Sequence, residues 1–300
     1  MLRAFGIGAL GARGTRAMQI EAFFHEPTNS VAYLLIDEAT KKAALIDPVL
    51  DYDQAAARVS TKLADALLAR VNAAGLTVEW ILDTHVHADH LTAMAYLKDK
   101  LGARTGIGRN VVQVQNLFRD FYNLPRDFPV DGRQFDRLFD DGERISLGNI
   151  EIEVMHTPGH TPACSIYRAG DAAFIGDTMF MPDYGTARCD FPGGDARTLY
   201  RSIKRILALP PQTRLFTGHD YAPNGRAYAW ESTVAEQAAR NVHIAGKTED
   251  EFVVLREGRD RTLNAPHLIL PALQVNIRAG VLPPPEPNGV RYLKIPMNRL

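Results

Sequence analysis

The residues best suited to chemistry in this sequence are histidines and aspartates, which gather in four short motifs. The densest motif is T-H-V-H-A-D-H at 84–90, and H-T-P-G-H-T follows at 156–161. Two more motifs, G-D-T and G-H-D, place Asp177 and His219 beside glycines. Imidazole nitrogens and carboxylate oxygens bind divalent transition metals such as zinc and iron. Because such a cluster directly after an apolar strand seldom arises for packing alone, the pattern predicts a metal-dependent enzyme.

The first motif offers ligands for more than one position. Side chains alternate along an extended loop, so His85 and His87 are expected to point the same way. Asp89 and His90 are expected to enter a helix and to face a second position. In the second motif, His160 is the stronger candidate ligand. Three histidines are interpreted as ordinary packing or surface residues: His25, His243 and His267. For His156, the alternative to a role at the metal is packing beside the site.

The elements around these motifs must bring them to one place. Residues 78–84 are typical of a buried strand, and 89–102 of a helix that Gly102 ends, so the first motif lies in a strand-to-helix loop. Ligand sites favour such loops in layered α/β folds. The other predicted elements are hairpins at 31–47, 145–157 and 164–178, helices at 54–73 and 196–209, a strand at 214–219 and a helix-like stretch at 230–243.

Composition excludes several classes of protein. The net charge is -1 and the pI is near 6.8, so no electrostatic footprint for nucleic acid or an anionic membrane is present. No apolar run approaches the roughly 20 residues that span a bilayer. Cys164 and Cys189 are too few for a disulfide scaffold and fit a reducing compartment. We therefore expect an enzyme of the bacterial cytoplasm. We also expect the protein to form a homodimer.

The chain divides into three parts by character. Residues 1–17 are basic and free of acids, which is typical of an untidy tail or a targeting segment; a presequence would instead place the protein in an organelle matrix. Residues 18–221 carry all the motifs. Residues 222–300 are expected to form a helical segment and a proline-rich extended arm that pack on the same domain.

In this order and spacing, the motifs T-H-V-H-A-D-H, G-H-T, G-D and G-H-D resemble those of the metallo-β-lactamase superfamily, over roughly residues 18–221. The resemblance implies an α/β fold (α+β by some schemes), built as a four-layer αββα sandwich with metal at one edge. It also implies ligands for two metals, in two sets that Asp177 bridges: His85, His87 and His160, and Asp89, His90 and His219.

Two branches of that superfamily fit best. Persulfide dioxygenases oxidise a thiol persulfide with O2 to sulfite and thiol, using one Fe(II) held by two histidines and a carboxylate. The resemblance assigns those roles to His85, His160 and Asp177, a triad that leaves positions open for O2 and substrate. The remaining candidates would surround these ligands or hold a second metal: His87, Asp89, His90 and His219.

The alternative branch is the glyoxalase II thioesterases, which hydrolyse acylglutathione with two Zn(II). Their bridging hydroxide attacks the thioester carbonyl. Because both branches retain the full ligand set, the ligands do not separate them. A third hypothesis, a closed structural zinc site, is disfavoured because neither cysteine falls in the motifs.

The stretch at 186–203 favours the dioxygenase branch. It is similar to the G-R-T-D-F…L-Y-x-S block of persulfide dioxygenases, with matches at Arg188, Asp190, Phe191, Leu199, Tyr200 and Ser202. It departs from that block at Ala187 and Cys189. This departure, with the tail R-Y-L-K-I-P-M-N, is closer to the bacterial β-lactamase hydrolase-like proteins, a subgroup tied to sulfide detoxification.

Two residues near the motifs are candidates for substrate binding. Arg188 lies in a loop bounded by glycine and proline, where its guanidinium could bind an anionic carboxylate or a persulfide anion; the alternative is an ion pair with Asp183 or Asp190. Tyr221 could donate a hydrogen bond near the site, or pack there. The expected substrates are O2 and a small thiol persulfide such as glutathione persulfide.

Overall fold

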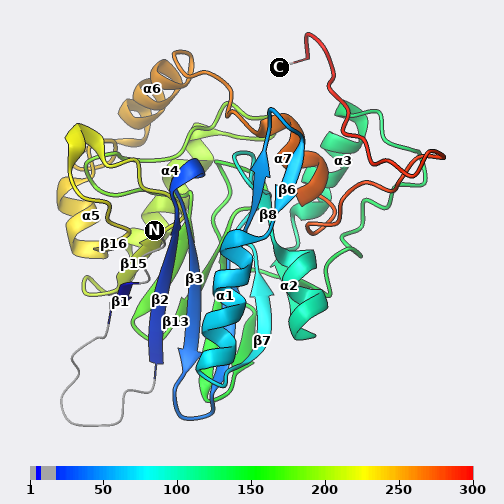
Figure 1. Ribbon diagram of the computed structural model, residues 1–300. Helices are drawn as coiled ribbons and strands as arrows, with labels where there is room; N and C mark the ends of the chain where they lie inside the picture. The colour runs from blue at the N-terminus through cyan, green and yellow to red at the C-terminus, as the bar shows by residue number, and fades with distance from the viewer. Residues whose placement is uncertain (1–4, 8–17, 300) are drawn as a thin grey trace.

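The computed structural model describes residues 5–7 and 18–299, and two facing β-sheets form its centre (Figure 1). The first sheet has the strand order β1-β2-β3-β4-β7-β9-β10. It is antiparallel from β1 to β4 and parallel from β4 to β10. Its strands are β1 (Phe5–Ile7), β2 (Met18–His25), β3 (Ser30–Asp37), β4 (Lys42–Ile46), β7 (Thr77–Leu82), β9 (Arg104–Gly108) and β10 (Arg137–Phe139).

The second sheet follows the order of the chain. All of its strand pairs are antiparallel except β14 with β15, which are parallel. Its strands are β11 (Arg144–Leu147), β12 (Ile150–His156), β13 (Ser165–Ala169), β14 (Ala172–Gly176), β15 (Arg214–Thr217) and β16 (Glu231–Thr233). A small third sheet has the order β6-β5-β8, with the strands β6 (Arg58–Ser60), β5 (Val49–Asp53) and β8 (Leu91–Thr92).

Helices cover the outer faces of both large sheets. Those on the first sheet are α1 (Lys62–Ala73), α2 (Met94–Leu101), α3 (Val111–Phe121) and α7 (Ile269–Asn276). Those on the second sheet are α4 (Ala196–Leu207), α5 (Val234–Arg240) and α6 (Glu249–Asp260). Short 3-10 helices occupy Glu26–Thr28 and Pro223–Gly225.

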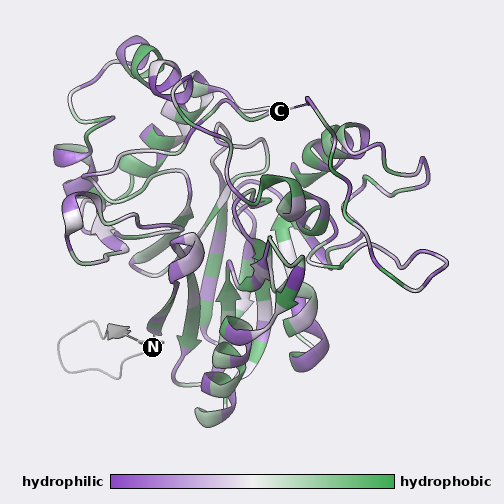
Figure 2. Cartoon of the chain, turned by 45° about the horizontal axis from the view of Figure 1, so that its top comes forward, coloured by the Kyte–Doolittle hydropathy of each residue, from purple (hydrophilic) through white to green (hydrophobic). Residues whose placement is uncertain are grey.

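The alternation of apolar side chains produces the layers. Along β3, Leu34 belongs to the cluster between the first sheet and its helices, whereas Tyr33 belongs to the cluster between the sheets. Phe174 and Ile175 divide β14 in the same way between the inter-sheet cluster and the α4 side. Buried strands therefore carry apolar residues on both faces. Figure 2 shows hydrophobic, green segments along the central strands. The resulting helix–sheet–sheet–helix order is the predicted αββα sandwich.

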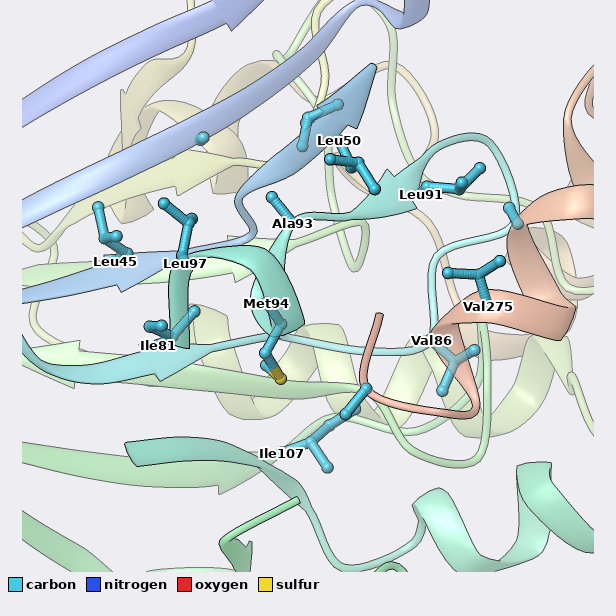
Figure 3. Close-up of a cluster of buried hydrophobic side chains, with 14 of the residues drawn as sticks. Leu45, Leu50, Ile81, Val86, Leu91, Ala93, Met94, Leu97, Ile107 and Val275 are labelled. Carbon is cyan, nitrogen blue, oxygen red and sulfur yellow. The ribbon is translucent and has the colours of Figure 1, made fainter. Parts of the chain in front are cut away.

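The outer cluster of the first sheet also reaches the metal-motif loop (Figure 3). Val86 from that loop and Val275 from α7 lie in the same group of side chains as Met94 and Leu97 from α2. Val86 and Ala88, which alternate with the candidate ligands of the first motif, are 2% and 7% exposed. These two side chains anchor the motif in the core.

The predicted hairpins at 31–47, 145–157 and 164–178 are confirmed, as is the helix from Ala196. The predicted helix at 54–73 is wrong over residues 54–61. Asp53 accepts a hydrogen bond from the Ala56 amide and Ala57 takes a positive φ, so the chain reverses and β6 pairs with β5 before α1 begins at Lys62.

The predicted helix at 89–102 also begins later than expected. Residues 91–92 pair with β5, and α2 runs only from Met94 to Leu101, although Gly102 ends it as predicted. Asp89 and His90 therefore lie in a loop. The stretch at 230–243 is a strand followed by a shorter helix, α5, which Thr233 caps.

Residues 5–7 pair with β2, and the rest of the predicted N-terminal tail lies outside the described residues. Within the described residues, 281–299 contain no helix or strand. None of the helices in the described ranges has the length and apolar character that a bilayer crossing requires.

Candidate metal centre

The four motifs meet at one edge of the sandwich because each follows the end of a strand. The first motif follows β7, and His160 lies between β12 and β13. Asp177 comes directly after β14, and His219 lies two residues after the end of β15. These two strands are parallel neighbours in the second sheet. An isolated bridge between Ser30 and His219 joins the two sheets at this edge. Strand ends from both sheets therefore present their side chains to one place.

Three side chains form the first candidate ligand set: His85, His160 and Asp177. Asp177 Oδ2 lies 3.8 Å from His85 Nε2 and 3.9 Å from His160 Nε2. His85 Nε2 and Asp177 Oδ1 are buried and have no hydrogen-bond partner in the protein. A buried polar atom without a partner is costly, so these residues fit a metal ion that would satisfy them.

The other ring nitrogen of each histidine is held by the protein. His85 Nδ1 lies 3.0 Å from Thr84 Oγ1, and His160 Nδ1 lies 2.7 Å from the carbonyl oxygen of Arg188. A proton on His160 Nδ1 donates to that carbonyl and leaves Nε2 with its lone pair. Such contacts fix the orientation of ligand histidines and increase their basicity.

A second set of candidates lies beside the first. His219 Nε2 is 3.2 Å from Asp89 Oδ2 and 3.5 Å from Asp177 Oδ1. His87, Asp89 and His90 also lie close enough to share an ion. Asp89 and His219 partner one another directly, whereas His87 Nδ1 is buried without a partner. The structure thus brings together every histidine and aspartate of the predicted ligand sets.

Burial favours the neutral form, which binds a metal, in two of these imidazoles, whereas nearby carboxylates raise the pKa of His87 and His219. Burial, helped by the neighbouring histidines, holds the pKa of His85 well below its ordinary value and lowers that of His90 to about 3. His87 differs: burial opposes its protonation, but the nearby carboxylate of Asp47 outweighs this and raises the pKa to about 10. Burial raises the pKa of Asp177.

Two glycines beside the ligands are needed for close approach. Gly159 has φ of +136°, and a Cβ there would lie 2.3 Å from the backbone of Leu199. A Cβ on Gly218 would lie 2.5 Å from Asp177 Oδ1. Both glycines therefore let the backbone pass close to the site.

Asp47 and Asn276 hold the motif loop, and the sequence analysis did not identify either residue. Asp47 accepts hydrogen bonds from the backbone and hydroxyl of Thr84, at 2.7 and 2.9 Å, and contacts His87 Nε2 at 3.1 Å. Asn276 donates to the carbonyls of His87 and His90 and accepts from the Thr92 amide. The sequence offered one sign that Asp47 is close to the site, because it precedes a proline at the end of β4, and β4 pairs with the strand before the first motif. It offered no such sign for Asn276.

A pocket of about 880 Å³ opens over the site. Asp89, His160 and Asp177 lie in its lining, together with Tyr221, which stacks on His219 at a ring-centroid distance of 5.8 Å. Tyr221 is 38% exposed, so its ring forms part of the wall. His25, interpreted from the sequence as an ordinary residue, also lines this pocket.

Arg188 lines the pocket but is already engaged. Its guanidinium forms a two-bond ion pair with Asp190, at 2.6 and 2.7 Å, and donates to the carbonyl of Asn264. The alternative considered for Arg188, an ion pair with Asp190, is therefore present. Among the described residues, Arg58 and Lys62 line the same pocket without an ion-pair partner. Arg58 was not recognised from the sequence because the predicted helix at 54–73 placed it inside a helical run.

Cys164 and Cys189 are both buried and free. Burial raises the pKa of the Cys164 thiol to about 12. Neither belongs to the candidate ligand sets, which agrees with the expectation from the sequence motifs.

The sequence pattern of the metallo-beta-lactamase superfamily matches residues 25–219, and the chain belongs to that superfamily. The crystal structure of ETHE1 from Myxococcus xanthus superposes with a TM-score of 0.71, over 87% of this chain and 99% of that chain, at 31% sequence identity. The predicted superfamily and fold class are thereby confirmed.

Three curated relatives carry different names. The chain is 56% identical to a beta-lactamase hydrolase-like protein of Xylella fastidiosa, over 94% of this chain, and spans 65% of that relative's length. It is 51% identical to glyoxylase B2 of Dictyostelium discoideum, over 94% and 98% of the two chains. It is 32% identical to the mitochondrial persulfide dioxygenase ETHE1 of Bos taurus, over 89% and 91%. These relatives support a metal-dependent enzyme that acts on small molecules.

Proposed function

We propose that this protein is an Fe(II)-dependent persulfide dioxygenase. It would oxidise the terminal sulfur of a thiol persulfide, RSS⁻ + O2 + H2O giving RS⁻ + SO3²⁻ + 2H⁺. One Fe(II) per chain would be held by His85, His160 and Asp177.

The contrast within the site carries this proposal. His85 Nε2 and Asp177 Oδ1 have no hydrogen-bond partner in the protein, whereas Asp89 and His219 contact one another at 3.2 Å. An ion at the first set satisfies atoms that are otherwise orphaned. Two histidines and one carboxylate are the ligand set of mononuclear non-haem iron, which keeps positions open for O2 and substrate. The persulfide dioxygenase name of one relative supports the same assignment.

When bound, iron supplies the activation of O2 that no side chain of this protein can provide. The chain's own residues supply orientation and charge. The carbonyl of Arg188 fixes the His160 ring, and the stacked ring of Tyr221 closes the pocket wall beside His219. The Arg188 guanidinium, tied to Asp190, is therefore proposed to act through the loop that carries this carbonyl rather than as a free anion receptor.

Charge on the pocket lining supports an anionic thiol carrier as the substrate. Arg58 and Lys62 line the pocket and are exposed, with no ion-pair partner among the described residues. A cation without a carboxylate partner in the protein can bind a carboxylate of the ligand. Glutathione persulfide carries two such carboxylates and remains the carrier that we propose.

A specific observation favours a second candidate, a two-zinc hydroxyacylglutathione hydrolase. His87 Nδ1 is also buried without a partner, and Asp89, His90 and His219 lie near enough to complete a second metal site. Two metals would polarise a thioester carbonyl and generate hydroxide at neutral pH. The glyoxylase name of one relative supports this candidate.

One experiment separates the two candidates. The protein is purified anaerobically without added metal, its metal content is measured, and O2 uptake is followed with glutathione persulfide. About one iron per chain and persulfide-dependent O2 uptake support the dioxygenase. Two zincs per chain, no O2 uptake, and hydrolysis of S-lactoylglutathione would reject it in favour of the hydrolase.

A further inference from the structure

A buried ion pair on α6 is in contact with the loop that carries Arg188. Its members, Arg256 and Asp260, are 1% and 4% exposed. Arg256 Nε and Nη2 lie 2.9 and 2.7 Å from Asp260 Oδ1. Because taking two charges out of water is expensive, a buried ion pair is weak evidence for a gain in stability. The other contacts of the pair are therefore the better guide to its role.

Those contacts are made with the backbone on both sides of Arg188. Arg256 Nη1 donates to the carbonyl oxygen of Thr186 at 2.9 Å. Asp260 Oδ2 accepts a hydrogen bond from the amide of Cys189, also at 2.9 Å. The pair thus holds the loop two residues before Arg188 and one residue after it.

The carbonyl group between these two contacts orients a candidate ligand. Arg188 O lies 2.7 Å from His160 Nδ1, and His160 Nε2 lies 3.9 Å from Asp177 Oδ2 in the first ligand set. The helix that carries the pair is itself fixed, since Phe252 of α6 lies in the same outer cluster as Leu199 of α4. The loop beside the ligand is therefore tied to a packed helix, the kind of support that holds a site in its geometry.

We propose that Arg256 and Asp260 are positioning residues, which fix the carbonyl of Arg188 and, through it, the ring of His160. Neither side chain touches the metal in this role. They keep His160 Nδ1 as a donor to the carbonyl, so that Nε2 retains its lone pair and its direction towards the metal. The inference rests on the proposed function only in taking His160 as a metal ligand, a role that this residue would have in both candidate functions.

The proposal is tested by replacing both members of the pair with apolar residues of similar size. Arg256→Met combined with Asp260→Leu leaves no unpaired charge in the core, and such replacements often preserve stability. The affinity of the metal-free protein for Zn(II), titrated against a chelator, should fall about 10-fold, at the low end for residues that support a ligand. The loss stays at the low end because the Thr186 amide remains hydrogen bonded to His243.

A spectroscopic measurement separates positioning from stability. In the Zn(II)-loaded protein, a proton on His160 Nδ1 that donates to a buried carbonyl exchanges slowly with water and gives a resolved imino signal in the proton NMR spectrum. The signal is assigned by its loss in His160→Ala. In the double variant of Arg256 and Asp260 this proton should exchange faster, whereas a pair that contributes only to stability would leave the signal unchanged.

The matched control is Arg70→Met combined with Glu21→Leu. Arg70 and Glu21 also form a two-bond ion pair, at 2.8 and 2.6 Å, but they do not line the pocket and belong to no candidate ligand set. This control should keep the wild-type Zn(II) affinity and His160 signal. Equal losses in both double variants would overturn the proposal, and so would an unchanged affinity or an unchanged His160 signal in the variant of the α6 pair.

If the variant of the α6 pair does not fold, Asp260→Glu decides. This substitution keeps the charge that faces Arg256 and lengthens the side chain by one methylene group, which displaces the Cys189 amide and the carbonyl before it. The His160 signal should then shift and exchange faster, with weaker Zn(II) binding. Wild-type affinity and a wild-type His160 signal in Asp260→Glu would overturn the proposal.

Failure of the proposed function is distinguishable from failure of this inference. Zn(II) affinity and the His160 signal are both measured without turnover. If the wild-type protein consumes no O2 with persulfide, the dioxygenase is rejected, and the comparison of the two double variants still decides whether the α6 pair positions His160.

Discussion

The two halves of the metal centre differ in how the protein treats their polar atoms. In the half formed by His85, His160 and Asp177, both histidines are anchored through Nδ1, and His85 Nε2 and Asp177 Oδ1 are left without a hydrogen-bond partner. In the half that contains Asp89 and His219, these two side chains lie within ion-pair distance of one another, at 3.2 Å, although His87 Nδ1 beside them has no hydrogen-bond partner. Histidines and aspartates of the two halves therefore differ in whether their polar atoms already have partners in the protein. This difference comes from the folded surroundings and not from the residue types.

The difference follows from what holds each half. Asp177 follows a strand of the second sheet and His85 follows a strand of the first, so the first half is fixed between two rigid layers. Asp89 lies in the motif loop, beyond the last residue that Asp47 contacts. A site on rigid elements keeps unpaired atoms apart, whereas a loop residue can turn to meet a partner.

The largest effect is expected from breaking the first half. His160→Ala should abolish iron binding and persulfide-dependent O2 uptake, because it removes one of three proposed ligands. The matched control is His156→Ala, four residues earlier, whose Nε2 contacts the carbonyl of Phe139 and which belongs to no candidate ligand set. Metal analysis and O2 uptake are measured on both. Retained iron in His160→Ala would contradict the assignment of the first half.

Asp47→Asn tests whether the first motif depends on its support. The substitution keeps the shape but removes the charge that faces His87, so the pKa of His87 should fall from about 10 in the metal-free protein. Loss of such a supporting carboxylate is expected to lower activity or metal affinity about 10- to 100-fold. The pKa is followed by NMR of the histidine ring and the affinity by metal titration.

The control for this substitution is Asp37→Asn. Asp37 is also buried, and it accepts hydrogen bonds from Thr40, Ala39 and Asn149. None of these residues belongs to a candidate ligand set. It should lose stability and keep the metal. Equal loss of metal affinity in both variants would mean that Asp47 acts only through folding.

These supports mark the limit of what the sequence could predict. The candidate ligands and most of the strands could be found because ligand type and strand periodicity are local signals, whereas the αββα sandwich was implied by the resemblance to the superfamily. Asn276 could not be found, since it bonds to a loop almost 190 positions away and its own neighbours are apolar. The helix start at 89 was wrong because pairing of Leu91–Thr92 with β5 outweighed local helix preference.

The same limit applies to the pocket. Arg58 was hidden by a helical periodicity that Asp53 and Ala57 interrupt. Helix α6 could have been found from T-E-D-E at 248–251, a capping box in which Thr248 and Glu251 bond to one another's backbone. His25 carries no sequence signal, because a single histidine shows its partners only in the folded chain.

His219→Gln should have a smaller effect than His160→Ala, and this difference sharpens the comparison between the halves. If one iron sits in the first half, the variant should keep about one iron per chain while O2 uptake falls on the order of 10-fold, as for residues that surround ligands. If two zincs are bound, the variant should lose one of them. Metal analysis before and after loading distinguishes these outcomes.

The smallest effect is expected at Arg58, which lines the pocket but belongs to neither half of the centre. Arg58→Ala should raise KM for glutathione persulfide about 5-fold, on the order of 1 kcal/mol, with kcat unchanged, because an exposed cation contributes little in water. Arg144→Ala is the matched control, since Arg144 is exposed on β11, pairs with Glu151 and does not line the pocket. A neutral persulfide carrier should show no difference between Arg58→Ala and wild type. Equal KM for the anionic carrier in Arg58→Ala and wild type would instead remove Arg58 from substrate binding, and the metal centre alone would then have to select the persulfide.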